Sequence, residues 1–149
     1  MNRGAKGLLL GTALVFSFAF AAELVGLELG PPAPGFDPSD LKTYRLAEKR
    51  RVFGPGDRAV LFVLRWRFEE EDVGPLPIEL YLIPPKGTLV RIGYTLNVPP
   101  AWVGRTISTY AYLRLTPERV RLYAGRWTVY VLANGELKGT GLFELRPDR

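Results

Sequence analysis

The chain has 149 residues, of which 47% are hydrophobic and 23% charged, with a formal net charge of +5 and neither cysteine nor histidine. Disulfides, thiolate and imidazole nucleophiles, and zinc sites built on Cys or His are therefore excluded, and with them Ser-His-Asp and Cys-His catalysis. The length suits one domain with its own core. Fifteen arginines against five lysines, no glutamine and 13 prolines are typical of a thermophile, although a GC-rich genome would give the same arginine excess.

The N-terminus has the pattern of an export signal. Two basic residues precede an apolar stretch over residues 7–22, and Ala19-Phe20-Ala21 places small residues where a signal peptidase reads them, which predicts cleavage after Ala21. The alternative is an uncleaved membrane anchor, although Glu23 ends the stretch short of the roughly 20 residues that cross a bilayer. We expect residues 1–21 to be an apolar signal helix, and the protein to be exported to the periplasm, the cell surface or the medium.

Residues 22–41 are predicted to be a Pro-rich spacer, because four prolines between Gly30 and Asp40 exclude a helix or a central strand. The folded domain is assigned to residues 42–149. Once residues 1–21 are removed, 18 basic residues remain against 15 acidic ones. Apart from Lys49-Arg50-Arg51, which we interpret as solvated, the bases are scattered, so nucleic acid is not an expected partner.

From residue 42 onward the chain consists of short alternating runs divided by Gly/Pro turns, which is typical of an antiparallel β protein. A weak edge strand is expected over residues 42–53, and a short helix begins at Thr116-Pro117. The clearest strand places every second residue from Val60 to Phe68 on one buried face, while its other face changes from apolar to charged. Further strands are expected near residues 78–83, 89–98, 106–115 and 127–131, with a last one before residue 145.

The last hairpin turns at Asn134-Gly135. A two-residue loop would direct Phe143 away from the face of Trp127, whereas a three-residue loop places both aromatic residues on the same face. Because the buried face sets the register, the sequence predicts the three-residue loop, with Gly135 in a bulge-type hairpin. The two glycines of the second strand, Gly139 and Gly141, are then expected to lie beneath large side chains.

The segment 125–145, with the pattern Gly-x-Trp-x-Val-x-Val-x-x-Asn-Gly continuing to Gly139 and Phe143-x-Leu145, resembles the final hairpin of immunoglobulin-like or fibronectin-III-like sandwiches in exported bacterial proteins. Residues 53–57 resemble the entry to the second strand of those domains, and residues 104–108 are similar to one uncharacterised exported family. The resemblance covers roughly residues 43–146 and implies an all-β, single antiparallel immunoglobulin-like sandwich of about seven strands. It also implies a binding, adhesive or spacer module, without implying any activity. Antibody-type domains are not indicated, because there is no Cys pair and no tyrosine corner beyond Tyr123.

Four exposed aromatic residues are the candidate binding residues. Trp102 lies in a loop stiffened by Pro99 and Pro100, where it either offers a rigid anchor to a partner or folds back to cover the end of the sandwich. Tyr110 and Tyr112 point outward from one strand and could extend that surface, joined by Tyr81. The alternative is that these tyrosines only cover the sheet, and Trp66 and Trp127 are assigned to the core by periodicity.

The densest acidic run is Glu69, Glu70, Glu71 and Asp72, at a turn between two strands. Carboxylate oxygens bind hard cations such as Ca²⁺, which makes the run a weak metal-site candidate, but no EF-hand spacing supports it. A solvated acidic turn is the alternative. No cofactor and no catalytic residue is predicted.

The sequence thus favours a non-catalytic exported module that binds a protein partner in the cell envelope through a sheet edge or face. A carbohydrate-binding module using the same aromatic residues is the first alternative, and a carboxylate-based hydrolase is a distant one. Membrane contact is expected only through the N-terminal segment, if it stays uncleaved.

Overall fold

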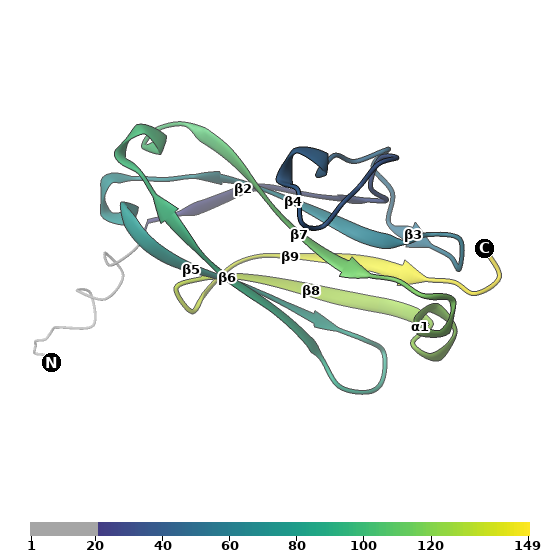
Figure 1. Cartoon of the computed structure of the whole chain (residues 1–149). Helices are drawn as coiled ribbons and strands as arrows, with labels where there is room; N and C mark the ends of the chain where they lie inside the picture. Colours follow the sequence, from purple (N-terminus) through teal and green to yellow (C-terminus); the bar gives the residue numbers. More distant parts are fainter. Residues whose placement is uncertain (1–20) are drawn as a thin grey trace, which may run out of the picture.

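A computed structural model describes residues 21–149, which form an all-β sandwich of two sheets (Figure 1). One sheet has the strand order β2-β4-β7 and the other β3-β9-β8-β5-β6. The predicted signal segment, apart from Ala21, lies outside the described residues, and among those described no helix is long and apolar enough to span a membrane. The strands are β2 (Glu23–Gly30), β3 (Val52–Phe53), β4 (Ala59–Arg67), β5 (Gly74–Ile83), β6 (Val90–Val98), β7 (Thr106–Arg114), β8 (Gly125–Ala133) and β9 (Glu136–Leu145).

Short helices join the strands at the ends of the sandwich. The first turn of α1 is capped as the sequence predicts, because the Thr116 side chain accepts a hydrogen bond from the Arg119 N–H and Pro117 occupies the first helical position. Figure 1 shows that the start of β2 and the C-terminus lie at opposite ends of the sandwich. The helices are η2 (Leu41–Thr43), η3 (Glu70–Asp72), η4 (Pro100–Trp102) and α1 (Pro117–Leu122).

The core lies between the two sheets and contains the alternating residues that the sequence predicts. The inward face of β4 is fully buried from Val60 to Trp66. Both tryptophans assigned to the core are buried, since Trp66 is 0% and Trp127 is 1% exposed. Trp127 stacks on Phe143 with ring centroids 5.4 Å apart, so two adjacent strands of the larger sheet share one aromatic layer.

Residues 22–41 are part of the folded domain, so the predicted spacer is wrong. β2 pairs antiparallel with β4 from Glu23 opposite Arg67 to Gly30 opposite Leu61. The proline-rich residues that follow cross the outer face of the smaller sheet, where Phe36 packs over Leu61. The physical reason is visible in β4: the apolar half of its second face needs a cover, and this segment supplies it.

The predicted edge strand over residues 42–53 is also wrong. Only Val52–Phe53 is a strand, and it runs parallel to the end of β9. The preceding residues cross from one sheet to the other: the Arg50 N–H donates to the Leu29 carbonyl of β2, and the Arg51 side chain donates to the Leu142 carbonyl of β9. The hydrogen bonds of this segment therefore connect β2 with β9 and do not extend either sheet by another strand.

β5 begins four residues earlier than expected and includes Pro75 and Pro77. Pairing with β8 starts only at Ile78, and the Pro77 carbonyl accepts the Asn134 N–H at 2.8 Å. Proline is tolerated here because its missing N–H faces a side where no strand runs alongside.

The β8–β9 hairpin corrects the predicted loop but keeps the predicted buried face. Ala133 lies opposite Glu136, so the loop has two residues, with φ of 49° at Asn134 and 79° at Gly135 as in a type I′ turn. A β-bulge between Leu132 and Val131 then shifts the register, which brings Trp127 opposite Phe143. The bulge allows the preferred two-residue Asn-Gly turn and still buries Trp127 and Phe143 on the same face.

Candidate binding groove between the β6 and β7 edges

β6 and β7 are the edge strands on one flank of the sandwich. β6 pairs only with β5, and β7 pairs only with β4. On β6 the inward side chains Val90, Ile92, Tyr94 and Leu96 are only half-buried, although they pack against the core. This flank therefore exposes both an apolar lining and strand edges.

The register shows which backbone groups of β7 are free. Just beyond the strand, the Leu115 N–H donates to the carbonyl of Arg58, the residue opposite. Since hydrogen-bonded and free positions alternate in an antiparallel pair, the backbone groups of Ser108, Tyr110 and Tyr112 point away from β4. The Arg114 carbonyl, which has the same orientation, accepts a hydrogen bond from the Arg119 side chain instead of from a strand.

The same reasoning applies to β6. The bond from Asn134 to Pro77 places the odd-numbered residues of β5 toward β8 and the even-numbered ones toward β6. In the β5–β6 register, Ile78 lies opposite Tyr94. The outward backbone groups of β6 therefore belong to Arg91, Gly93, Thr95 and Asn97.

A groove of about 580 Å³ runs between the two edges. Its walls include Ile92 and Leu96 from β6 and Ile107 and Ala111 from the inner face of β7. It also extends around β7 to that strand's outer face, where Tyr110 and Tyr112 line it. No charged side chain is among the lining residues, so the groove offers an apolar surface on both sides of a free strand edge.

Polar groups occur at the base of the groove and are partnered. The buried Thr109 hydroxyl accepts the Trp66 Nε1–H at 3.0 Å and lies 3.2 Å from the Tyr94 hydroxyl. Burial raises the pKa of Tyr94 above its usual value, and the hydrogen bond with Thr109 lowers it in part. This contact joins β6 to β7 across the flank and leaves the phenol uncharged near neutral pH.

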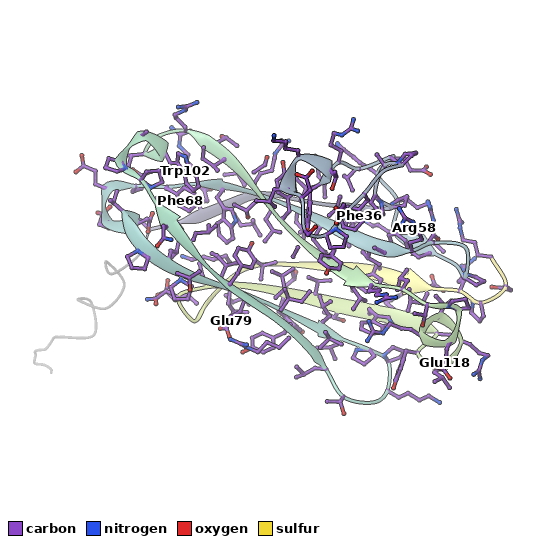
Figure 2. All side chains as sticks on the ribbon, in the orientation of Figure 1. Phe36, Arg58, Phe68, Glu79, Trp102 and Glu118 are labelled. Carbon is purple, nitrogen blue, oxygen red and sulfur yellow. The ribbon has the colours of Figure 1, made fainter. Side chains whose placement is uncertain are left out.

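Trp102 lies at one end of the groove and is half-buried. Its ring stacks on Phe68 with centroids 5.9 Å apart, and Phe68 stacks on Trp66 in turn; Figure 2 shows Trp102 beside Phe68. The tryptophan thus covers the end of the sandwich with one part of its surface and lines the groove with another. Its position therefore has features of both alternatives given by the sequence, a cover for the end of the sandwich and a side chain that a partner could contact.

Tyr110 and Tyr112 belong to an aromatic cluster on the outer face of the smaller sheet. Tyr44 contacts both tyrosines, with interplanar angles of 59° and 77°, and Phe36 meets Tyr112 edge-to-face at 74°. Rings in these orientations do not form the coplanar strip on which a sugar would stack. Sequence reasoning missed both residues. Phe36 lies in the segment interpreted as a spacer, and Tyr44 lies among the residues expected to form a weak edge strand.

Tyr81 lies apart from the other candidates. It is on β5 of the larger sheet, where its hydroxyl donates to Glu79, which in turn pairs with Arg91. Figure 2 places Glu79 on the sheet opposite Phe36. The structure therefore brings Trp102, Tyr110 and Tyr112 to one groove and leaves Tyr81 on another face.

The acidic turn separates into two parts. Glu69, Glu70 and Glu71 are exposed, whereas Asp72 is fully buried and accepts backbone N–H groups with both oxygens. Across residues 21–149, no group of three potential metal-ligating side chains gathers. The turn is a capped corner of the fold, in which Asp72 faces inward.

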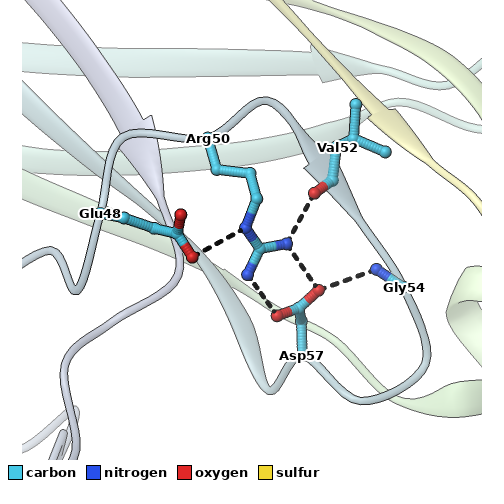
Figure 3. Close-up of polar contacts among 5 residues, drawn as sticks. All are labelled: Glu48, Arg50, Val52, Gly54 and Asp57. Atoms are coloured by element: carbon cyan, nitrogen blue, oxygen red, sulfur yellow. Dashed lines mark hydrogen bonds and ion pairs between the residues drawn. The ribbon is translucent and has the colours of Figure 1, made fainter. Parts of the chain in front are cut away.

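The basic run Lys49-Arg50-Arg51 is occupied by internal contacts, as Figure 3 shows for Arg50. Its guanidinium makes two hydrogen bonds with Asp57, at 2.9 and 3.1 Å, and donates to the Val52 carbonyl at 2.7 Å. Burial alone would raise the pKa of Asp57, but the hydrogen bonds from Arg50 and the Gly54 N–H outweigh it and hold the pKa below its usual value. Arg50 therefore fixes the crossing segment to the Phe53–Asp57 turn.

Comparisons with known proteins support the fold. No family model matches the sequence, and no curated protein matches it. Among solved structures, an immunoglobulin-like protein of Pseudomonas aeruginosa matches 86% of this chain and 98% of its own, at 16% identity and a TM-score of 0.50. The alkylpurine DNA glycosylase AlkC of Pseudomonas fluorescens, bound to DNA containing an abasic site analog, matches 84% of this chain at 18% identity and a TM-score of 0.55, but this chain spans only 30% of that enzyme. At these identities the likeness concerns the fold, which is a β-sandwich similar to that of an immunoglobulin-like protein.

Proposed function

We propose that this protein is a non-catalytic, exported binding module of the immunoglobulin-like type, and that it accepts an extended segment of a protein partner in the cell envelope along the free edge of β7. Export is proposed from the signal-like residues 1–21. In this mode of binding a peptide adds a strand to an existing sheet, with main-chain hydrogen bonds supplying affinity and side-chain pockets supplying specificity.

The observation that carries the proposal is that the groove follows both faces of β7. A strand added beside Ser108–Tyr112 would direct alternate side chains to opposite faces of the sheet. Its inward side chains would meet Ile107, Ala111 and the Tyr94 ring, and its outward ones would meet Tyr110 and Tyr112. The groove has apolar walls at both places, and the free N–H and C=O groups lie between them.

The chemistry favours an alternating apolar segment. The lining carries no charged side chain, so burying an ionised group there would be costly without a partner. A sugar is less well matched, since stacking on a pyranose face uses a flat, exposed ring and the aromatic residues here meet edge-to-face.

The test uses a displayed library of extended nine-residue peptides, selected on the wild-type protein. Selected peptides are then measured against Ser108→Pro, which removes an outward N–H from β7, and Thr95→Pro, which removes an outward N–H from β6. Both side chains are exposed and edge positions tolerate proline, so the two variants are matched.

We expect Ser108→Pro to weaken binding about tenfold, as the loss of one or two main-chain hydrogen bonds implies, and Thr95→Pro to leave the affinity within about twofold. Backbone amide shifts on peptide binding should follow β7. Equal affinity of both variants, or loss only in Thr95→Pro, would contradict strand addition at β7. A library that yields no binder on the wild-type protein would contradict the binding proposal itself.

A further inference from the structure

Asp72 is the only charged side chain that is fully buried among residues 21–149. Its Oδ1 atom accepts the N–H groups of Ala21, at 2.8 Å, and Ala22, at 3.1 Å, and its Oδ2 atom accepts the Glu69 N–H at 2.8 Å. The ion pairs of the described part of the chain all use other carboxylates. Asp72 therefore holds a buried charge against the first residues of the folded domain without a cation beside it.

We propose that Asp72 is the binding site for a new α-ammonium group at Ala22, produced when the peptide bond between Ala21 and Ala22 is hydrolysed. This inference rests on the export part of the proposed function. A peptidase adds water across the bond: the hydroxyl goes to the Ala21 carbonyl carbon, and a hydrogen goes to the Ala22 nitrogen. That nitrogen then takes up a proton from solvent and becomes positively charged.

The geometry suits this exchange. Hydrolysis removes the Ala21 N–H from Oδ1, but the Ala22 nitrogen, already 3.1 Å away, gains two hydrogens that can replace it. The buried carboxylate then has a cation in direct contact, and a hydrogen bond between two ionised groups is stronger than one to an amide. In the intact chain Asp72 is fully buried and Ala22 is only 2% exposed, so the carboxylate that would meet the new amine lies inside the fold.

The burial of Ala22 also sets the order of events. A peptidase must bind the chain on both sides of the bond in an extended form, and in the folded domain Ala22 is enclosed. Hydrolysis therefore precedes folding, and the new amine is captured when η3 and β2 come together. The charged groups around this corner are Glu69 before η3, Glu70 and Glu71 on η3, Glu23 on β2, Arg67 on β4 and Arg105 after η4.

The composition gives an unusually clear readout. The chain has no histidine and no cysteine, and carboxyl, phenol, lysine and guanidinium groups ordinarily titrate outside the range from about pH 6 to 9. An α-amine ordinarily has a pKa of about 7.7 to 8.0 and lies inside that range. A carboxylate partner raises the pKa of the amine in the folded state, so the stabilisation is full below about pH 7.7 and is lost as the pH rises through the raised value.

The full chain is expressed in an exporting bacterial host, and the purified product is examined by mass spectrometry. We expect Ala22 to be the first residue. The folding equilibrium constant of this processed protein should be constant from about pH 6 to 7 and fall above about pH 8. The total fall should be about tenfold for each unit by which contact with Asp72 raises the pKa of the α-amine. The fall should be absent in a form acetylated only at Ala22, which keeps the N–H but not the charge, and in Asp72→Asn; Glu71→Gln, at an exposed neighbour, should retain it.

Each outcome decides a separate point. A product that starts at another residue, or an intact chain, would overturn the processing at Ala21–Ala22. A product that starts at Ala22 but has the same pH dependence with and without acetylation would overturn the capture by Asp72, even if Asp72→Asn failed to fold. Neither result would bear on peptide binding at β7, which the library experiment tests.

Discussion

The two flanks of the sandwich are built in opposite ways. On one flank, β2 of the smaller sheet approaches β9 of the larger one, and residues 46–53 cross between them. On the other, the Tyr94 hydroxyl of β6 lies 3.2 Å from the Thr109 hydroxyl of β7, and a groove of about 580 Å³ runs between the two strands. The closed flank uses its strand edges for internal hydrogen bonds, whereas the open flank leaves them available.

Glycine makes the close approach on the closed flank. A Cβ atom added to Gly139 would lie 2.6 Å from Leu24 Cδ2, and one added to Gly141 would lie 2.9 Å from Leu27 Cδ2. The prediction that these two glycines lie beneath large side chains is confirmed, and the covering leucines come from β2. Exposed strand edges can pair with other chains, so the proposed binding at β7 would use the flank whose edges are left unpaired.

The largest expected effect is at Gly30, where β2 passes the crossing segment. An added Cβ would lie 1.9 Å from the Glu48 carbonyl oxygen, and because that atom is backbone it cannot rotate away. We expect Gly30→Ala to lower the free energy of unfolding by about 3 kcal/mol. Gly93→Ala is the matched control on the open flank, since its Cβ would meet only the flexible end of Arg91. Urea denaturation of both variants measures the difference; equal losses would contradict the contrast between the flanks.

The next effect concerns the Arg50–Asp57 pair, which anchors the segment that closes the flank. Asp57→Asn leaves the largely buried guanidinium with only the exposed Glu48 as an anionic partner, and we expect a loss of about 2 kcal/mol at pH 7. The pKa of Asp57 is lowered, so its contribution is present above the usual value of about 3.9 and is lost as the pH falls through the lowered value. The stability gap between wild type and variant should therefore shrink below about pH 4. Glu70→Gln, at an exposed site, should show no gap at either pH.

The sequence predicted the open flank better than the closed one. Period-two alternation in β4, β6 and β7 depends only on which face is buried, and those faces are where the sequence placed them. Trp102, Tyr110 and Tyr112 were singled out because they occupy outward-facing positions of such strands and loops, and in the structure all three are half-buried. Their partner Tyr94 was assigned only to an apolar face, since nothing local indicates that this face would be left half covered.

The closed flank depends on contacts between residues far apart in the sequence. Phe36 is in a proline-rich stretch that can hold no regular strand, and Tyr44 is in the following residues, where the expected strand does not form; both cover Leu61 of β4. The sequence did contain one indication of this contact. Half of the second face of β4 is apolar and must be covered by other residues, and Phe36 was an aromatic residue that had no assigned place in the core. The bulge that follows Asn134-Gly135 had no comparable signal, because a two-residue loop followed by a bulge buries the same face as a three-residue loop does.

A loss no larger than that of Asp57→Asn is expected for the contact that joins the edge strands of the open flank. Thr109→Val removes the acceptor of the buried Trp66 Nε1–H, which should cost about 2 kcal/mol, while Tyr94→Phe leaves that acceptor in place and should cost under about 1 kcal/mol. Thermal unfolding of the two variants measures the difference. If Tyr94→Phe lowered the stability more than Thr109→Val, the Tyr94 hydroxyl would be a main contact between the two sheets. The flank could then not be described as open.

The smallest effect on stability should accompany a clear effect on binding. Leu41 is 70% exposed and lines the outer side of the groove, whereas Leu137, 58% exposed, lies at the start of β9 away from it. Leu41→Ser and Leu137→Ser should each change the free energy of unfolding by less than about 0.5 kcal/mol, because neither side chain is packed in the core. Only Leu41→Ser should weaken the selected peptides, by about fivefold, since it alone removes apolar area that a strand on β7 would cover. Equal affinities for the two variants would restrict the binding surface to the inner face of β7 and exclude a strand that uses both.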